Sequence, residues 1–430
     1  MSTLEQFASS GDADAAEPLS VDAAYYRVWR SALTASTVGT IGLELESHVV
    51  NLDALAEPVP WETLEPLPAS VDRAAGHNAV SREPGGQLEL SAPPQASVLA
   101  AVNGLRDDLD RVRAALAEFG VGLAQAGTDP LRPSRRMNPG DRYRAMEEHF
   151  ARDRSGHPAA VMNSSASIQV NLDAGPRHAW SERVAHAHRL GPTLTAIAAN
   201  SPWLHGKATG WQSSRMRGWF GLDRRRCGPV VGPVIAAGKP GTTADPATAW
   251  TRFALRAPVM FVRRGPGLSA VVPDVTFEQW VTGEVPLGDR LPTAADLDLH
   301  LTTLFPPVRM RGYLELRYLD ATPARWWPAV VAVVATAMDD PVAADRTAEA
   351  TERTGGLWSQ AARYGLADAR LAESARRCLR IVADRVPAAL ANDVADLAEL
   401  VESGRSPADV LAERIAKVGP EAALAELARP

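Results

Sequence analysis

Polar and apolar residues alternate along four parts of the chain, as they do in strands that bury one face. These parts lie within residues 38–50, 78–92, 165–173 and 309–319. The second part is expected to form two short strands around a Pro-Gly-Gly turn at 84–86. The alternation predicts an antiparallel sheet that has one polar and one apolar face.

Apolar residues recur at helical spacing between and after these strands. Helices are expected at residues 21–35, 95–119, 141–154, 177–199, near 246–256, at 276–282, and in a series from 326 to the end. Strands and helices are interspersed without a βαβ rhythm, so the expected fold class is α+β with an antiparallel sheet.

The chain is expected to form one domain over residues 19–430, with a helical layer over 340–430. Residues 1–18 are acidic and rich in small residues, which predicts a disordered tail. The stretch 201–241 is rich in Gly, Arg and Trp and has little periodicity, as long functional loops do.

Composition and charge limit the partners that this chain can have. The formal net charge of −6 argues against nucleic acid, because phosphates are neutralised by clustered Lys and Arg. The longest apolar stretch, 329–338, is far shorter than the ~20 residues of a membrane span. The N-terminus lacks the basic start and apolar run of a signal peptide. We expect a cytoplasmic protein with no membrane contact and no obligate protein partner.

The two cysteines, Cys227 and Cys378, have neither metal-ligand spacing nor a disulfide pattern, which fits a reducing compartment. Gly238–Lys239 does not end a P-loop, because the required glycine and the following Ser or Thr are missing. His186 and His188 stand two apart on an expected helix and therefore on different faces, so packing is favoured over a metal pair. Trp326 and Trp327 are expected to pack in the core.

The polar faces of the expected strands carry an unusual set of side chains. They are Glu44 and Glu46, Gln87 and Glu89, Ser167, Gln169 and Asn171, and Glu315 and Arg317. Glutamate is depleted in strands, and carboxylates on one concave face repel each other unless cations neutralise them. Such oxygen ligands suit Mg²⁺ or Mn²⁺, whose remaining positions substrate phosphates would fill. Arg317 then suits a transferring phosphoryl group.

A simpler interpretation is that each strand has an ordinary solvated face. The residues alone lead to a metal–phosphate site and not to a reaction. The basic run 224–226 is equally open, since it is either a solvated turn or a contact for a phosphate or carboxylate.

Six motifs, in order along the chain, resemble those of the plant-type glutamate–cysteine ligases. They are Ile-Gly-Leu-Glu-Leu-Glu at 41–46, Glu-Pro-Gly-Gly-Gln-Leu-Glu-Leu-Ser at 83–91, Gln-Val-Asn-Leu-Asp at 169–173, Ala-Asn-Ser-Pro-Trp at 199–203, Ser-x-Arg-x-x-x-Trp ending at 219, and Tyr-Leu-Glu-Leu-Arg at 313–317. Arg142, Tyr143 and Met146 are similar to the start of a family helix. The approach to the third strand is most similar to the bacterial branch that supplies ergothioneine synthesis. Ser164 stands where the plant enzymes have a glutamate-binding arginine.

The resemblance implies a glutamine-synthetase-like catalytic fold, in which an antiparallel sheet curves into a half-barrel with helices outside. It implies ATP-dependent ligation of L-glutamate, through γ-glutamyl phosphate, to L-cysteine. The metal ligands would be Glu44, Glu46, Glu89 and Glu315, with Glu46 and Arg317 in catalysis, Gln169 and Glu83 in the metal and nucleotide shell, and Arg215, Trp219, Asn171 and Ser165 at the substrates.

Two alternatives stay open at this point. No motif predicts a contact to the thiol of cysteine. The sequence is therefore also compatible with a ligase of the same fold that uses another amine acceptor. A non-catalytic relative that only binds metal or nucleotide fits less well, because Glu44, Glu46, Glu89, Glu315 and Arg317 are all intact.

Overall fold

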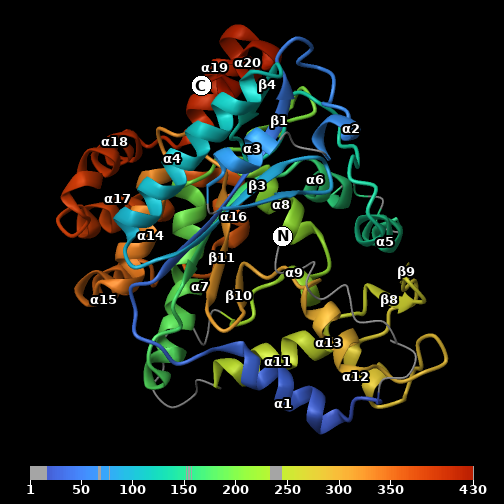
Figure 1. Ribbon diagram of the computed structural model, residues 1–430. Helices are drawn as coiled ribbons and strands as arrows, with labels where there is room; N and C mark the ends of the chain where they lie inside the picture. The colour runs from blue at the N-terminus through green and yellow to red at the C-terminus, as the bar shows by residue number, and fades with distance from the viewer. Residues whose placement is uncertain are drawn as a thin grey trace.

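The computed structural model describes residues 17–65, 69–76, 78–151, 153, 155, 157–232 and 245–429 (Figure 1). The tail expected at 1–18 falls almost wholly outside the described residues, and so does the Gly238–Lys239 pair.

An antiparallel sheet of seven strands forms the centre of the molecule (Figure 1). The strand order is β10 (Val308–Met310), β11 (Leu314–Asp320), β5 (Ser167–Leu172), β1 (Ile41–Asn51), β3 (Leu88–Gln95) and β2 (Ala79–Arg82), and β4 (Val121–Ala124) pairs with the far half of β1. Every pairing is antiparallel. The strand order leaves β10 and β2 as edges, so the sheet is open, and the expected α+β class is confirmed.

The apolar face of the sheet packs against three helices: α4 (Val98–Ala117), α7 (Trp180–Ile197) and α14 (Trp327–Asp339). The side chains of Leu43, Leu45, Leu90 and Val170 are fully buried on this face. They alternate in sequence with the polar residues, because neighbouring strand residues point to opposite faces. Helix α14 is apolar on nearly all sides and lies within the core, where Trp327 is fully buried as expected.

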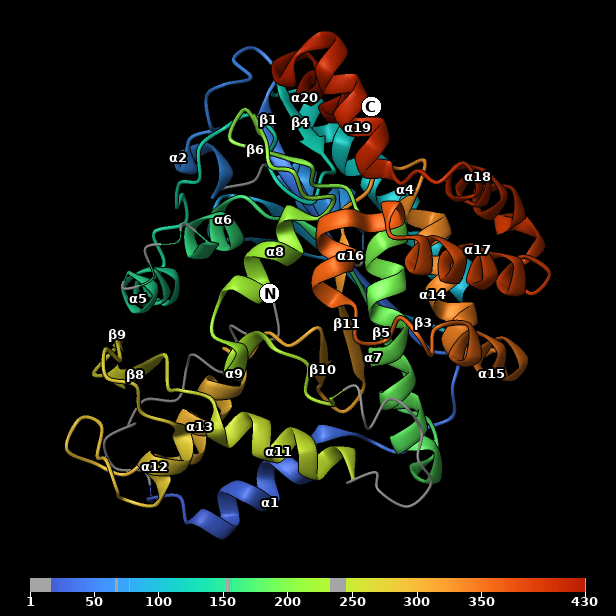
Figure 2. The same ribbon diagram turned by 180° about the vertical axis from the view of Figure 1, so that it is seen from behind.

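The C-terminal part of the described chain is helical, as expected, and packs outside α7 and α14 (Figure 2). Its helices are α15 (Pro341–Ala350), α16 (Trp358–Tyr364), α17 (Ala369–Ala383), α18 (Ala391–Glu402), α19 (Pro407–Val418) and α20 (Pro420–Ala428), with 3-10 turns η2 (Gly365–Ala367) and η3 (Ala388–Leu390). Helix α20 reaches back to β4, so the end of the chain closes over the far half of β1.

A second group of elements lies at the opposite end of the molecule (Figures 1 and 2). It contains α1 (Val21–Ala32), α11 (Pro246–Arg256), α12 (Phe277–Val281), α13 (Ala294–Leu301) and the hairpin β8 (Phe261–Arg264) to β9 (Gly267–Ala270). The remaining elements are α2 (Trp61–Leu64), α3 (Ala69–Ala74), α5 (Asp141–Phe150), α6 (His157–Asn163), η1 (Arg177–Ala179), β6 (Trp203–Leu204), β7 (Lys207–Ala208), α8 (Ser214–Gly221) and α9 (Arg224–Cys227).

The single strand expected at 309–319 is wrong, because this segment folds into the hairpin β10–β11. Gly312 lies at its turn with φ 83°, a left-handed conformation that glycine adopts at little cost. The amide of Gly312 donates to Ala32 O (3.0 Å), which fixes the turn against the end of α1. Alternation of polar and apolar residues continues through both strands, so it could not reveal the turn.

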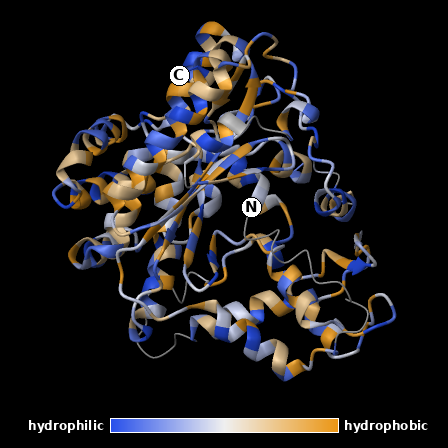
Figure 3. Cartoon of the chain, viewed as in Figure 1, coloured by the Kyte–Doolittle hydropathy of each residue, from blue (hydrophilic) through white to orange (hydrophobic). Residues whose placement is uncertain are grey.

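Helix α8 begins within the stretch expected to be irregular, where the hydroxyl of Ser213 accepts from the amide of Met216 (3.2 Å). Figure 3 shows hydrophobic and hydrophilic residues mixed along the sheet and along most helices. Among the described helices, none is by itself long and apolar enough to cross a membrane; α14 and α15 pass that test only as a pair, bent by 100°.

Candidate active site

The strand register aligns the polar residues in one stripe across the sheet. Glu46 lies opposite Glu89, and Glu44 lies opposite Gln169. Directly opposed residues of an antiparallel pair share a face, so their side chains gather on the side away from the core helices. From β2 to β10 the stripe runs through Ser81, Glu89, Glu46, Glu44, Gln169, Asn171, Glu315 and Arg309.

Arginines hold the β10–β11 end of this stripe. Arg309 donates from Nε (2.6 Å) and Nη2 (2.7 Å) to the two oxygens of Glu315, a bidentate pair. Arg317 donates from Nη1 to Gln169 Oε1 (2.7 Å) and also to Glu315. Burial raises the pKa of Glu315, but Arg309 and Arg317 outweigh it and lower the pKa to about 2. Glu315 is therefore ionised and holds Arg317 over the sheet.

The other carboxylates have the opposite electrostatic environment. Burial, and then repulsion from Glu315 and Glu89, raises the pKa of Glu44 to about 7. Burial and the neighbouring Glu46 raise the pKa of Glu89 to about 6. Burial also raises the pKa of Glu46, and burial with repulsion from Glu89 and Glu46 raises that of Glu83. For these four carboxylates, the nearby positive charge does not offset the effect of burial on the pKa.

Neighbouring polar groups orient these glutamates. Asn171 Nδ2 donates to Glu44 Oε1 (3.0 Å), and the amide of Ser167 donates to Glu46 Oε2 (2.7 Å). Glu89 Oε1 accepts from Ser91 Oγ (2.9 Å) and Ser81 Oγ (3.2 Å). The second oxygen of Glu46, Oε1, accepts from Gln169 Nε2 (3.3 Å).

A divalent cation fits this donor set by its chemistry. The stripe supplies only hard oxygen ligands, and their raised pKa values show that added positive charge would stabilise their ionised forms. In the described part of the chain, no three His, Cys, Asp or Glu side chains are already drawn together closely enough to hold a metal ion. The glutamates would therefore have to converge when a cation binds.

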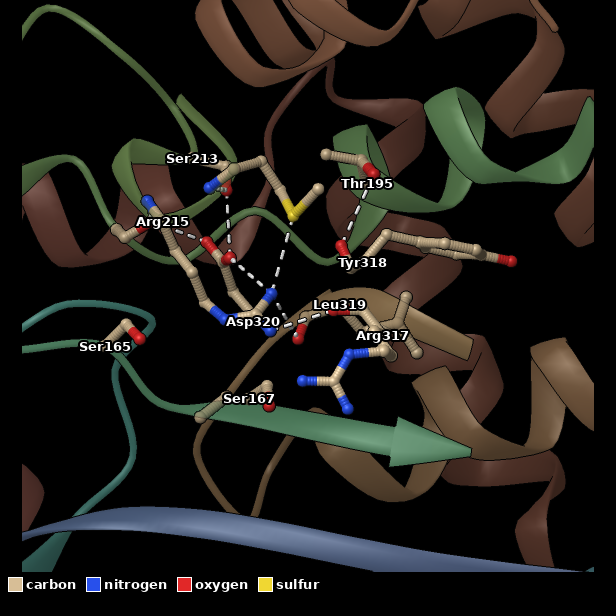
Figure 4. Close-up of polar contacts among 12 residues, drawn as sticks. Ser165, Ser167, Thr195, Ser213, Arg215, Arg317, Tyr318, Leu319 and Asp320 are labelled. Atoms are coloured by element: carbon tan, nitrogen blue, oxygen red, sulfur yellow. Dashed lines mark hydrogen bonds and ion pairs between the residues drawn. The ribbon is translucent and has the colours of Figure 1, made fainter. Parts of the chain in front are cut away.

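Arg215 and Trp219 both lie on α8, and Figure 4 shows Arg215 beside Arg317. Arg215 is buried, and its Nη2 donates to the carbonyl of Arg317 (2.8 Å). Its Nε and the Nε1 of Trp219 are buried without a partner among the described residues.

A narrow cavity separates α8 from β11. Its free volume of ≈ 10 Å³ is about the space of one water molecule. It is lined by Arg215, Met216, Trp219, Cys227, Phe305, Pro306, Pro307 and Arg317. An amino-acid substrate would enter here only if the side chains moved apart.

The structure separates two serines that are close in sequence. The hydroxyl of Ser165 donates to Val161 O (2.5 Å), so its one proton is used within the protein. The hydroxyl of Ser167 is fully buried on the polar face and has no partner among the described residues. Asn171 uses its Nδ2 on Glu44, and its Oδ1 is also unpartnered. Ser167 belongs to the same alternating trio as Gln169 and Asn171, so the sequence contained the signal for it.

Arg309 and Tyr143 are further residues of the site that sequence reasoning had not selected. Alternation alone puts Arg309 at the start of one long strand, and only the hairpin brings it beside Glu315. Repulsion from Glu83, and then burial, raises the pKa of Tyr143.

Several other candidates have structural roles. Arg226 is fully buried and donates to Thr303 O (2.7 Å) and to Pro258 O, and Arg225 pairs with Asp223 and Asp274 at the surface. Arg225 thus fits the solvated-turn alternative, whereas Arg226 fits neither alternative, because its guanidinium is buried against backbone carbonyls.

The two helix histidines are buried in separate contacts. His186 is bonded to Ala337 O (3.0 Å) and His188 to Val184 O (2.8 Å). The expectation of packing rather than a metal pair is confirmed.

The open antiparallel sheet carries carboxylates and arginines on one face and helices on the other. The structure matches the crystal structure of a glutamate–cysteine ligase (gshA) from Francisella tularensis in complex with AMP, with a TM-score of 0.56 and 12% identity, over 92% of this chain and 88% of that one. The fold is therefore the glutamine-synthetase-like ligase fold.

Residues 40–427 match the family model described as glutamate-cysteine ligase family 2 (GCS2), and the chain belongs to this family. It is 46% identical to glutamate–cysteine ligase EgtA of Mycolicibacterium smegmatis over 98% of this chain and 97% of that protein. It is 49% identical to EgtA of Mycobacterium tuberculosis over 88% and 86%. The chloroplastic glutamate–cysteine ligase of Arabidopsis thaliana is 30% identical over 64% of this chain and 51% of that protein.

Proposed function

We propose that this protein is an ATP-dependent glutamate–cysteine ligase, which joins the γ-carboxylate of L-glutamate to the amine of L-cysteine. The observation that carries the proposal is the polar stripe, where three glutamates with raised pKa values, Glu44, Glu46 and Glu89, lie beside an arginine that is held in place. Glu83, next to the stripe, has a raised pKa as well. High identity to EgtA proteins over nearly the whole chain supports the choice of both amino acids.

The reaction has two steps. In the first, the γ-carboxylate oxygen of glutamate bonds to the γ-phosphorus of ATP, the bond from that phosphorus to the bridging oxygen breaks, and ADP leaves. Negative charge spreads over the phosphoryl oxygens as this happens. Arg317 donates hydrogen bonds to these oxygens, and Glu315 and Gln169 keep its guanidinium in position.

In the second step, the amine nitrogen of cysteine attacks the carbonyl carbon of γ-glutamyl phosphate. The bond from that carbon to the phosphate oxygen breaks, the nitrogen gives up a proton, and γ-glutamylcysteine and phosphate are released. Exclusion of water protects the acyl phosphate, and the narrow cavity between α8 and β11 would provide it.

Glu44, Glu46, Glu89 and Glu315 would hold Mg²⁺ or Mn²⁺, with Glu83 and Gln169 beside the metal and nucleotide. When bound, these ions neutralise the triphosphate and the charge that develops during transfer. Both oxygens of Glu315 accept from arginines, so Glu315 would have to give up part of its bidentate bond to Arg309 to bind the ion.

We assign Arg215 to bind the α-carboxylate of glutamate. We assign Trp219 to help hold the same substrate. Both have a buried donor that is free to bind a ligand. Asn171 is a further substrate donor, whereas the bond from Ser165 to Val161 O favours a structural role for that serine.

We also place the reaction in the cytoplasm and in ergothioneine synthesis. Support for the pathway comes from the motifs shared with that bacterial branch and from the identity to EgtA proteins. Support for a reducing compartment comes from Cys227 and Cys378, which are buried free thiols.

The decisive experiment is mass detection of γ-glutamylcysteine from purified protein, ATP, Mg²⁺, glutamate and cysteine, with each component omitted in turn. We expect product only in the complete mixture, with one ADP per γ-glutamylcysteine. ADP release with a panel of other amines tests the acceptor. Equal turnover with amines that lack a thiol would support the broader carboxylate–amine ligase, and no ADP release at all would contradict catalysis.

A further inference from the structure

Asp320 is a buried carboxylate at the end of β11, three residues after Arg317. The register between β11 and β5 shifts by one residue between Leu316 and Leu319, which is a β-bulge. Because of this shift Asp320 lies opposite Ser167 and shares its face, while Leu319 points into the core. The bulge thereby moves a carboxylate onto the polar side of the sheet.

Asp320 accepts hydrogen bonds from three donors on the chain that leads into α8 (Figure 4). Its Oδ2 accepts from Ser201 Oγ (2.6 Å) and from the amide of Asn200 (3.0 Å). Its Oδ1 accepts from Ser213 Oγ (2.9 Å) and lies 4.0 Å from Nη1 of Arg215.

The same two serines bind the first turn of α8. Ser201 Oγ accepts from the amide of Arg215 (3.2 Å), and Ser213 Oγ accepts from the amide of Met216 (3.2 Å). A hydroxyl has one proton to donate and lone pairs to accept with. Since a carboxylate only accepts, Asp320 forces both hydroxyl protons toward itself and both lone pairs toward the helix amides.

A carboxamide cannot reproduce this arrangement. In Asp320→Asn, one side of the group becomes an NH₂ donor, so the serine on that side loses the acceptor for its hydroxyl proton, and the hydroxyl has to rotate. The group would also lose the charge that faces Arg215. Gly127 leaves no free space for the new group to shift, because a Cβ at that position would lie 2.5 Å from Asp320 Cγ.

We propose that Asp320 is a positioning residue for substrate binding: through Ser201 and Ser213 it fixes the start of α8 and thereby Arg215 and Trp219. This inference rests on the proposed function, in which α8 holds glutamate. Among the described residues, the hydrogen bonds to Glu46 and Glu89 come from other strand residues and not from Asp320, Ser201 or Ser213. Glu46 interacts with this network only through the charge of Arg215. A substitution of Asp320 should therefore change the KM for glutamate more than the KM for ATP.

The test is steady-state kinetics of the full-length Asp320→Asn protein with glutamate and ATP varied in turn. We expect the KM for glutamate to rise roughly 10- to 100-fold, the range for losing a contact to a charged group, while the KM for ATP stays within about twofold. Ser213→Ala keeps the carboxylate and removes one hydroxyl, so its KM for glutamate should rise less, also without a change for ATP.

Asp339→Asn is the matched control. Asp339 is a partly buried aspartate that is also paired with an arginine, Arg183 (2.8 Å), but it lies at the end of α14, in the helical layer. This substitution should lower stability without changing either KM. If Asp320→Asn also changed only stability, or raised both KM values equally, the positioning role would be overturned. A wild-type protein that forms no γ-glutamylcysteine would contradict the proposed function instead.

Discussion

Each glutamate of the polar stripe has its own environment, although the sequence presents them as equivalent. Arginines flank Glu315 and keep its pKa near 2, while Glu44 lies among other carboxylates with a pKa near 7. One end of the stripe therefore holds an arginine, and the other end attracts a cation.

Glu46 is the residue at which a neutral substitution should be most harmful. Its side chain is partly buried, lies opposite Glu89 and accepts from Ser167 N and Gln169 Nε2. Glu46→Gln removes one negative charge without changing size, so we expect turnover to fall by roughly 10³-fold or more. Far-UV circular dichroism should be unchanged, and binding of Mn²⁺ alone, measured by calorimetry, should weaken.

The control for this change is Glu118→Gln, the same substitution at an exposed position after α4. It should leave both turnover and Mn²⁺ binding as they are in the wild type. Near-normal activity of Glu46→Gln would rule out the metal assignment for this residue.

Ser167 and Ser165 give a second test at the scale of single residues. Ser167→Ala removes a buried hydroxyl that faces the site without a partner, and should lower kcat/KM about tenfold. Ser165→Ala removes a bond to Val161 O and should cost about 1 kcal/mol of stability with nearly normal kinetics. Kinetics and urea unfolding of both variants distinguish them; a larger kinetic loss in Ser165→Ala would reverse the assignment.

At this scale the sequence predicted which residues face the site, because alternation alone decides the side of a strand. It could not predict which hydroxyls are already bonded. That depends on the distance between Ser165 and the last turn of α6, which only the folded chain determines.

At the scale of elements, the packing of α16 on α7 depends on a glycine inside a helix. A Cβ placed on Gly191 would lie 1.9 Å from the ring of Trp358, so the indole rests directly on the helix backbone. Trp358 also packs edge-on against Tyr318 of β11, with 5.6 Å between ring centroids. The glycine thus connects the helical layer to the strand that carries Arg317.

Gly191→Ala should lower the free energy of unfolding by about 1–3 kcal/mol, the usual cost of overpacking a core. Gly104→Ala in α4 is the matched control, since a Cβ there meets nothing within 4 Å. It should be neutral, or should stabilise by up to about 1 kcal/mol through helix propensity. Urea unfolding of both variants provides the measurement, and equal effects would contradict the close packing.

Most long elements were predictable from periodicity, including β1, β5, α4 and α11. The exceptions have local causes. The β10–β11 turn depends on the left-handed conformation of Gly312 and on a bond to Ala32, nearly 280 residues earlier in the chain. Helix α8 is too short to show a period, and its start is fixed by Ser213.

At the scale of the whole molecule, the fold buries histidines that must stay neutral. Burial, followed by the charge of Arg226, lowers the pKa of His300 to about 3, and burial lowers those of His186 and His188 to about 4. In the unfolded chain a histidine titrates near 6.5. Between these values the unfolded state binds more protons, so these groups make the folded state less stable as the pH falls below about 6.5.

We expect His300→Gln to reduce the pH dependence of unfolding. Glutamine keeps a donor for the carbonyl of Ala254, which His300 Nε2 contacts at 2.8 Å, but it does not titrate. Between pH 7.5 and 5.5, the loss of unfolding free energy should be about 1.4 kcal/mol smaller than in the wild type. This difference corresponds to the titration of His300 over one pH unit, from about 6.5 to 5.5, in the unfolded chain. Urea unfolding at the two pH values measures it.

His178→Gln, at an exposed position on η1, is the matched control and should keep the wild-type slope. The carboxylates of the polar stripe titrate in the opposite sense, but they are common to all three proteins and cancel in the comparison. An unchanged slope in His300→Gln would contradict a neutral buried imidazole.

The extra residue in β11 acts as a change of parity. Odd and even residues of a strand point to opposite faces of the sheet. A single added residue therefore exchanges the faces of all residues that follow it in the strand. Without it, Leu319 would lie among charges and Asp320 in the core. The spacing between Arg317 and Asp320 therefore carries as much information as their identities. In a relative that has the same two residues at a different spacing, the two side chains would not lie in this arrangement.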